Sequence, residues 1–440
     1  MSEAWAERET PLQRVTDAAM EAMRPHHMPA AEPHPLVLKN AQDAFRLPGL
    51  PRWTRLMLAL APRISHGSIT VGLPDGRAVM ARGAQGGPDA RLQINDHAFA
   101  RRLLLGGNLG VGRAYIDGAF DSPDLATLTH WACLNTDLDD TLMGKPWLRL
   151  ARRIGFALAA NSRRGSRRNI AFHYDLGNAF YARWLDPSMT YSAGLWQRGD
   201  ESLETAQTNK YRRLARDVLK LSPGQSVLEI GCGWGGFAEV AAREFGARVH
   251  AVTISREQYD YTCRRMQEAG LNEQVKVELR DYRDLDGQRY DAIASIEMIE
   301  AVGEKYWPVY FRRLRDSLNP DGRIGLQVIV IADRYFESYR GTMDFIQAYI
   351  FPGGMLLSPA TIAGQSAAAG LRISSSFSFG RDYARTLNDW HRRFEAAWPE
   401  IRELGFDERF RRMWRYYLAY CEGGFNAGTI DVMQYGFRPR

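Results

Sequence analysis

The sequence predicts an α/β fold with a doubly wound, Rossmann-like sheet, preceded by a smaller α+β domain. At 440 residues the chain exceeds the roughly 250–300 residues at which single cores stop growing, so two domains are expected. Strand and helix patterns alternate strictly in the second half, which is typical of a parallel sheet. Hydrophobic residues make up 45% and charged residues 25% of the chain, a balance that supports packed cores and excludes disorder.

The chain is expected to have four parts. They are an irregular, proline-rich lead-in at 1–45, a small domain at 46–147, a basic linker at 148–169 and the α/β domain at 170–440. In the small domain, the turn Leu73-Pro74-Asp75-Gly76 joins two short apolar runs and predicts a hairpin. Helical patterns follow around 97–105 and 124–134.

The linker is strongly basic and partly apolar. It holds Arg149, Arg152, Arg153, Arg163, Arg164, Arg167 and Arg168 and no acidic residue. Clustered arginines are typical of a solvated linker, and equally of a surface that meets anionic phospholipid. On such a surface each basic residue contributes on the order of 1 kcal/mol.

Other classes of protein are excluded by composition and spacing. The longest apolar runs, 324–332 and 56–61, fall short of the roughly 18 residues of a membrane-spanning helix. The first thirty residues show no secretory signal, so a cytoplasmic protein is expected. The four cysteines are scattered without metal-ligand spacing, which predicts reduced thiols and no metal. The net charge of +6 is accompanied by no nucleic-acid motif, so no nucleic-acid partner is expected.

In the α/β domain, the pattern predicts a strand at 226–230, a helix at 235–245 and a strand at 248–253. The remaining elements are expected to be strands at 275–279, 290–295 and 322–331, with a helix at 306–318 before the last strand. Sheets of this kind bind ligands beyond the carboxyl ends of their strands.

A glycine-rich turn follows the first of these strands and opens a helix. It reads Gly231-Cys232-Gly233-Trp234-Gly235-Gly236, and glycines there let a ligand approach the main chain. A dinucleotide site favours an acidic residue at the end of the second strand, where this chain has Thr253-Ile254-Ser255 and then Gln258. Since S-adenosylmethionine has no phosphate and suits a Glu-x-Gly-x-Gly turn, it is the better candidate for the cofactor.

The sequence resembles the cyclopropane-fatty-acyl-phospholipid synthases and the related fatty-acid methyltransferases over most of its length. The motifs that carry the resemblance are His173–Asn178, Met189–Ser192, Val227–Phe237, Thr253–Gln258, Met298–Gly303, Tyr383–Leu387 and Trp390. The segment Gly112–Gly118 is similar to part of the extra N-terminal domain of longer bacterial members, which implies a lipid- or membrane-associated domain at 46–147.

The resemblance implies methyl transfer from S-adenosylmethionine to a cis double bond of an acyl chain in a membrane phospholipid. It implies that Tyr191, Ser192, Gly231 and Gly233 line the methionine end of the cofactor, Thr253 and Gln258 the ribose, and Asp281 and Tyr282 the adenine. It also implies a peripheral enzyme on an anionic membrane surface, at the inner face of the cell membrane, and allows a homo-oligomer.

In the cyclopropane-forming relatives a bicarbonate ion takes the departing proton. Of the residues that hold it there, Glu300 and Tyr383 are present here. The cysteine after Tyr-Ser is replaced by Ala193, and the histidine on the fifth strand by Gln327. These departures put bicarbonate in doubt and favour a methyl- or methylene-branched acyl product over a cyclopropane, the alternative product.

Alkene methylation itself constrains the site. An alkene is a weak nucleophile, so the reaction needs a sulfonium donor, close alignment and a dry pocket. Positive charge then forms on carbon, and aromatic faces stabilise it by roughly 0.5–2 kcal/mol each. The segment 335–352 is rich in aromatic residues and predicts either such a role or a helical lid. A methyltransferase of a soluble small molecule is the remaining enzyme alternative.

Overall fold

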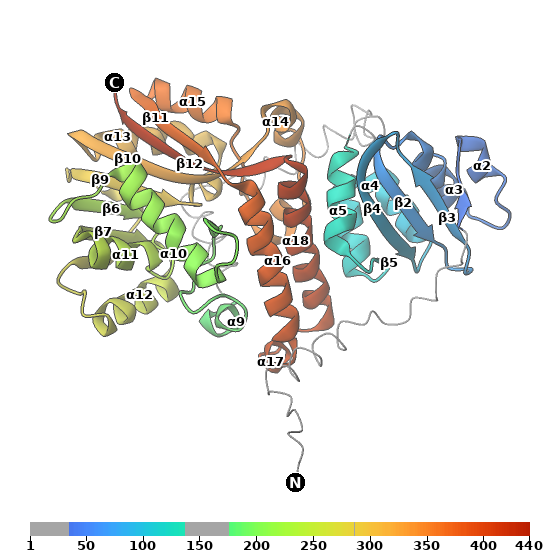
Figure 1. The fold of residues 1–440 in the computed structure, drawn as a ribbon, viewed down its shortest axis with the longest axis horizontal. Coiled ribbons are helices and arrows are strands. Elements are labelled where there is room, and N and C mark those ends of the chain that lie inside the picture. Colours follow the sequence, from blue (N-terminus) through green and yellow to red (C-terminus); the bar gives the residue numbers. More distant parts are fainter. Residues whose placement is uncertain (1–34, 137–175, 286) are drawn as a thin grey trace, which may run out of the picture.

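The computed structural model describes residues 35–136, 176–285 and 287–440. The chain forms a five-stranded sheet with its helices and a seven-stranded sheet with its own. Two long helices, α16 (Gly380–Ala396) and α18 (Glu408–Ala427), stand between these halves (Figure 1). The basic linker predicted at 148–169 lies outside the described residues.

The N-terminal half is an α+β domain, as predicted. Its sheet has the order β1-β3-β2-β4-β5, and the expected hairpin is the antiparallel pair β2–β3. The elements are β1 (Leu36–Val37), α2 (Ala41–Phe45), α3 (Arg52–Leu58), η1 (Ala61–Arg63), β2 (His66–Gly72), β3 (Ala78–Arg82), β4 (Gln85–Ile94), α4 (Ala98–Ile116), β5 (Phe120–Asp121) and α5 (Leu125–Leu134).

Two expectations for this half differ from the structure. Ordered structure begins before residue 46, because β1 pairs with β3 and Asn40 forms a capping box at the start of α2. The helix expected at 97–105 continues to residue 116 and is kinked at Gly107 (φ 53°, ψ −146°). The glycine adopts a backbone conformation that other residues avoid, so the helical pattern resumes beyond a break.

The C-terminal half is the predicted doubly wound domain. Its sheet has the order β11-β12-β10-β9-β6-β7-β8. The first elements are α9 (Asn178–Ala182), α10 (Leu203–Arg213), η2 (Leu214–Leu219), β6 (Ser226–Ile230), α11 (Gly236–Phe245), β7 (Arg248–Thr253), α12 (Arg256–Glu268), β8 (Val275–Leu279), η3 (Tyr282–Asp284) and β9 (Tyr290–Ile296). The others are η4 (Ile299–Ala301), η5 (Glu304–Tyr306), α13 (Trp307–Asp316), β10 (Leu318–Ile331), α14 (Asp333–Arg340), η6 (Ile346–Ile350), α15 (Pro359–Ala368), β11 (Leu371–Ser378), α17 (Trp398–Glu403) and β12 (Ile430–Pro439).

The sheet is mixed, so the expectation of a purely parallel sheet is wrong at one edge. Strands β6 to β10 are parallel, whereas β12 runs antiparallel to both β10 and β11. Strand β11 (LRISSSFS) is largely exposed and has a weak apolar pattern. It therefore lacks the buried-strand signal that marks the centre of the sheet. The strand order reverses at β6, where doubly wound folds bind ligands.

The two halves share one apolar core. Helix α16 buries Tyr383, Leu387, Trp390 and Phe394, at the spacing of one helical face. Helix α18 buries a matching face and packs against α5 and α4 of the N-terminal domain. Its Arg412 donates hydrogen bonds to the carbonyls of Tyr115 and Phe120. The N-terminal domain is thus packed directly on α18, which also contacts β12 of the second sheet.

Candidate active site

A cavity of about 1670 Å³ opens at the carboxyl ends of β6, β7 and β9. All but one of the residues predicted for the site line it: Tyr191, Ser192, Gly231, Gly233, Thr253, Gln258, Asp281, Tyr282, Glu300 and Tyr383. Gln327 is fully buried behind this surface and does not line it. Residues far apart in the sequence thus meet where the fold predicts a ligand.

The glycine-rich turn shapes one wall of the cavity. Gly231 and Gly233 have φ values of 81° and 54°, which disfavour any residue with a side chain. A Cβ atom on Gly231 would lie 2.8 Å from Cγ of Met298, whereas a Cβ on Gly233 would meet nothing within 4 Å. The main chain at Gly233 is therefore open to the cavity and accessible to a ligand.

Residues at the ends of β7 and β8 form two further parts of the cavity wall. Thr253 ends β7, and its hydroxyl donates to Oε1 of Gln258 at 2.8 Å. Asp281 follows β8 and forms a buried ion pair with Arg283 at 2.6 Å. The ring of Tyr282 packs edge-on against Tyr310, 5.5 Å away. These side chains are held in place by neighbours, so the polar wall is rigid.

Tyr191 and Ser192 precede α10 and are fixed by it and by the long helices. The Tyr191 hydroxyl lies 2.6 Å from that of Tyr417 on α18. The Ser192 hydroxyl accepts a hydrogen bond from Nζ of Lys210, a fully buried lysine that the sequence analysis missed. Burial lowers the pKa of Lys210 to about 7. A titratable cation therefore lies directly behind the cavity wall.

Glu300 lies in η4, after β9. Its Oε1 accepts the backbone N–H of Ile329 at 2.6 Å, and its Oε2 is buried without a hydrogen-bond partner among the described residues. Burial, assisted by the nearby charge of Glu297, raises the pKa of Glu300 to about 8. One carboxyl oxygen thus remains available to a group in the cavity.

Glu297 is the second residue that the sequence analysis missed, and it is the centre of a cluster. Its Oε1 accepts the backbone N–H of Ala193 at 3.0 Å and the amide of Gln327 at 2.7 Å. Its Oε2 accepts the hydroxyl of Tyr383 at 2.7 Å. We call Ala193, Glu297, Gln327 and Tyr383 the Glu297 cluster. A second carboxylate, immediately after β9 and three residues before Glu300, was the signal that could have revealed it.

The orientation of each donor in the Glu297 cluster is fixed from behind. Oε1 of Gln327 accepts from Nε2 of Gln434 at 3.0 Å, so the amide nitrogen of Gln327 faces Glu297. Burial, and next the charge of Glu297, raise the pKa of Tyr383, which keeps its hydroxyl protonated. The carboxylate of Glu297 therefore receives three hydrogen bonds from donors that cannot turn away.

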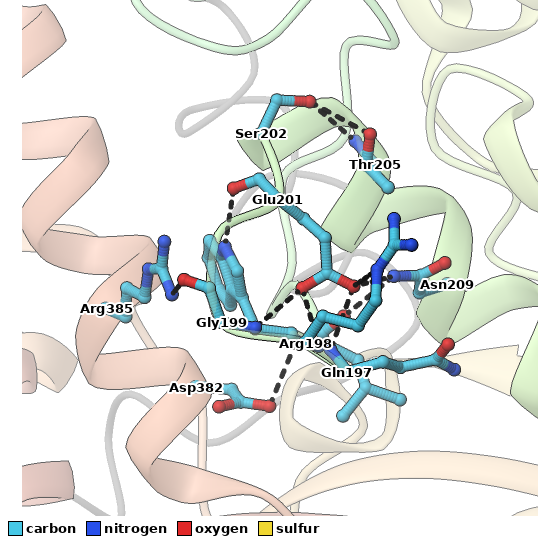
Figure 2. A network of polar contacts seen from close by, with 11 residues as sticks. Gln197, Arg198, Gly199, Glu201, Ser202, Thr205, Asn209, Asp382 and Arg385 are labelled. Carbon is cyan, nitrogen blue, oxygen red and sulfur yellow. Dashed lines mark hydrogen bonds and ion pairs between the residues drawn. The ribbon is translucent and has the colours of Figure 1, made fainter.

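The segment that carries the Ala193 N–H is clamped to α16. Gly194 N–H donates to Thr386, Trp196 N–H donates to Asp382, and Arg385 donates to the carbonyl of Gly199. Figure 2 shows the next turn, where the carboxylate of Glu201 accepts three consecutive backbone N–H groups, from Gln197 to Gly199. Because α16 also carries Tyr383, one helix positions two of the groups that contact Glu297.

The aromatic segment 335–352 contributes to the cavity only in part. Tyr335, Tyr339 and Phe351 line it. Phe345 is instead fully buried, with its ring 4.7 Å from that of Tyr416 on α18. Tyr417 and Tyr420 of α18 add aromatic wall that the sequence did not reveal. Part of the cavity wall is aromatic, and part of the predicted lid is core packing.

Other features bear on the kind of site. Within residues 35–136, 176–285 and 287–440, no group of His, Cys, Asp or Glu side chains could hold a metal ion. Over the same ranges no helix is long and apolar enough to cross a membrane. The four cysteines are not joined in disulfides.

Comparisons with known proteins agree with this geometry. A family model described as mycolic acid cyclopropane synthetase matches residues 161–435. The chain is 40% identical over 350 residues to a tuberculostearic acid methyltransferase of Mycobacterium tuberculosis. The matched region covers 77% of this chain and 80% of that protein. It is 38% identical over 357 residues to the cyclopropane-fatty-acyl-phospholipid synthase of Escherichia coli, with 80% and 88% covered.

Solved structures are similar over part of the chain. A cyclopropane synthase from Mycobacterium tuberculosis matches with a TM-score of 0.58 and 29% identity, covering 62% of this chain and 97% of that one. A mycolic acid cyclopropane synthase complexed with SAH and CTAB matches with a TM-score of 0.57 and 28% identity, with the same coverage. S-adenosylmethionine is accordingly the co-substrate. The chain belongs to the mycolic acid cyclopropane synthetase family, as an S-adenosylmethionine-dependent methyltransferase or cyclopropane synthase acting on lipids.

Proposed function

We propose that this enzyme methylates the cis double bond of an unsaturated phospholipid acyl chain and releases a methyl- or methylene-branched acyl product. One observation carries the proposal. The carboxylate of Glu297 is bound to Ala193 N–H, Gln327 and Tyr383, three of the positions to which the family resemblance assigns the bicarbonate ion. In this proposal Glu297 is the base that receives the departing proton.

The co-substrate lies along the glycine-rich turn. When bound, S-adenosylmethionine supplies the electrophilic methyl group. Its methionine end is held by Gly231, Gly233, Tyr191 and Ser192, and the open main chain at Gly233 supports this placement. Thr253 and Gln258 hold the ribose, and Asp281 and Tyr282 hold the adenine, as their common position on the cavity wall supports. Lys210 fixes the hydroxyl of Ser192.

Bicarbonate does not fit this site. A bound anion needs several converging donors to remain ordered. Here the donors of Ala193, Gln327 and Tyr383 already serve the carboxylate of Glu297. A second anion in contact with that carboxylate would be repelled, so no step is assigned to bicarbonate.

The tethered carboxylate favours a branched product for a physical reason. Methyl addition to one alkene carbon leaves a secondary carbocation on the other carbon. Three hydrogen bonds hold both oxygens of Glu297 in place, so the carboxylate cannot follow the methyl group and removes its proton slowly. Slower proton removal gives a hydride time to migrate from the methylated carbon, and this produces the more stable tertiary cation. Loss of a proton from the methyl group to Glu297 then leaves a methylene branch, and loss from a neighbouring chain carbon leaves a methyl branch beside a shifted double bond.

The alternative product is a cyclopropane. It forms if Glu297 removes a proton from the methyl group before the hydride migrates, so that the methyl carbon closes onto the cation. Glu300 supports either outcome at a pH above its pKa of about 8, since an ionised carboxylate near the reacting carbons opposes positive charge in a water-poor site. The aromatic part of the cavity wall, including Tyr383 and Tyr417, adds attraction for a cation.

A donor with a fully deuterated methyl group tests the product. We expect a branched acyl chain that retains two deuterons as a methylene group or three as a methyl group. Proton spectra should lack the resonances of a cyclopropane ring. A cyclopropane as the sole product would contradict the branched assignment.

The proposal includes docking on an anionic membrane at the inner face of the cell membrane. Large exposed apolar side chains on the N-terminal domain support it: Leu36, Val37, Phe45, Leu56 and Leu105. Exposed charges are screened beyond about 8–10 Å at ordinary salt. Sedimentation with anionic vesicles should therefore weaken as salt rises, and equal binding to neutral vesicles at low salt would contradict docking. A homo-oligomer stays a prediction, for which ultracentrifugation is the measurement.

A further inference from the structure

The cavity does not end at the active site but continues into the N-terminal domain. There it is lined by Ile69 and Val71 of β2, Leu92 of β4, Phe120 of β5, and Leu125 and Leu128 of α5. These side chains are buried in that domain's own core. At about 1670 Å³ the cavity exceeds the roughly 300–1,000 Å³ of a site for a drug-sized ligand. We call the part inside the N-terminal domain the inner compartment.

The connection between the two parts passes between α4 and α5 on one side and α18 on the other. Cys133 of α5 and Tyr420 of α18 line it. Gly106 and Gly107 line it where α4 is kinked, and a Cβ atom on Gly106 would meet nothing within 4 Å. A regular helix with side chains here would narrow the passage, so the kink and the glycines keep it open.

The chemistry of the inner compartment suits hydrocarbon. Among the described residues of the N-terminal domain that line it, none is charged. A charged headgroup there would lose its hydration without gaining a partner, which is strongly unfavourable. An unfilled apolar cavity also destabilises the core around it, so an apolar occupant stabilises the fold.

We propose that the inner compartment binds a hydrocarbon chain of the substrate lipid while another part of the same lipid reacts beside Glu297. The N-terminal domain is then part of the substrate site and selects acyl-chain length. This inference rests on the lipid substrate of the proposed function and is independent of whether the product is branched or cyclic. Two sources provide the chain: the far end of the reacting acyl chain, or the companion chain of the phospholipid.

A matched pair of valines provides the first test. Val71 lines the compartment, whereas its cross-strand partner Val79 does not and is packed in the core. Val71→Phe should fill empty space and largely preserve the melting temperature. Val79→Phe should crowd a packed core and lower it. Fluorescence of cis-parinaric acid, measured without S-adenosylmethionine, should report weaker binding to Val71→Phe than to Val79→Phe.

The decisive measurement is the dependence of rate on chain length. Vesicles of phosphatidylglycerol are prepared in two series, one varying the reacting chain beyond its double bond and one varying the saturated companion chain. In Val71→Phe the ratio of long-chain to short-chain rates should fall by about ten-fold, the discrimination that one or two methylenes give in an apolar pocket. An effect in one series assigns the compartment to that chain.

A second pair guards against misfolding of Val71→Phe. Gly106→Leu places a side chain in the passage, and Gly364→Leu makes the same change on the exposed surface of α15. Gly106→Leu should shift the chain-length profile, and Gly364→Leu should leave it unchanged. Unaltered profiles in both series for Val71→Phe and Gly106→Leu would overturn the compartment, whatever the product. A cyclopropane product with an altered chain-length profile would contradict the branched product alone and would leave the compartment supported.

Discussion

The hydroxyl of Tyr383 donates to Oε2 of Glu297 at 2.7 Å, and so joins α16 to the end of β9 inside the cavity. The two residues are 86 positions apart. With Ala193 and Gln327 on the other oxygen, this contact holds the carboxylate of Glu297 in one orientation. The first prediction concerns that carboxylate.

Replacing Glu297 by glutamine should keep the shape of the Glu297 cluster and remove its proton acceptor. Turnover should fall by about 10²–10⁴-fold, the usual contribution of a general base. The measurement is the rate of methyl transfer to phospholipid vesicles at saturating co-substrate. Near-normal turnover in a folded Glu297→Gln protein would exclude Glu297 as the base.

Replacing Glu297 by glycine should have a different result. Glu297 has a φ of 48°, a conformation that glycine adopts easily, so this variant should fold. Its empty donors should accept an external anion. Added bicarbonate should therefore restore part of the turnover and shift the product toward cyclopropane, while leaving the wild type and Glu297→Gln unchanged. If bicarbonate stimulated all three proteins alike, the assignment of Glu297 as the base that occupies these donors would be wrong.

Replacing Gly233 by valine should abolish tight binding of the co-substrate. The φ of 54° disfavours a branched residue, and the side chain would project into the space left for the ligand. Titration calorimetry with S-adenosylhomocysteine measures the effect. Gly86→Val, on the exposed part of β4, is the matched control and should bind normally. Unchanged affinity in a folded Gly233→Val protein would move the co-substrate away from the glycine-rich turn.

Above pH 8, where Glu300 is ionised, Glu300→Gln should lower turnover by about 10²-fold, since it removes a charge that opposes the developing cation. It should also alter the pH dependence of stability. The pKa of Glu300 is raised from 4.5 to about 8 in the folded chain, which therefore binds more protons than the unfolded chain between these values. The wild type's free energy of unfolding should fall as pH rises through this window, and Glu300→Gln should lack that component.

Chemical denaturation at several pH values measures this component. Glu268→Gln, an exposed change at the end of α12, is the control. Normal turnover by Glu300→Gln above pH 8 would give Glu300 a structural role only.

Lys210→Met should weaken co-substrate binding, because Ser192 loses the donor that orients its hydroxyl. Lys210 should affect the pH dependence of stability with the sign opposite to that of Glu300. Burial lowers the pKa of Lys210 from 10.5 to about 7, so the unfolded chain binds more protons between these values. Lys210 therefore makes the wild type's free energy of unfolding rise with pH across this window, and Lys210→Met should lack that rise. An identical pH profile for both proteins would show that Lys210 does not titrate in the folded state.

The sequence alone determined the features whose signals are local. The strand before Gly231, the glycine turn and the helix after it have short-range patterns, and all three occur as predicted. The α/β class, the hairpin of the first domain and ten of the eleven named site residues on the cavity wall were also accessible from periodicity and family resemblance.

Only the tertiary structure decided which of these residues touch. Ala193, Glu297, Gln327 and Tyr383 lie in four separate segments, and none has a local pattern that indicates the others. Gln327 was predicted as part of the site, but the fold places it behind Glu297, where its amide positions the carboxylate. The antiparallel edge strands and the inner compartment likewise arise from packing between distant elements. Hydrophobic periodicity specifies which face of an element is buried, and long-range packing decides what that face meets.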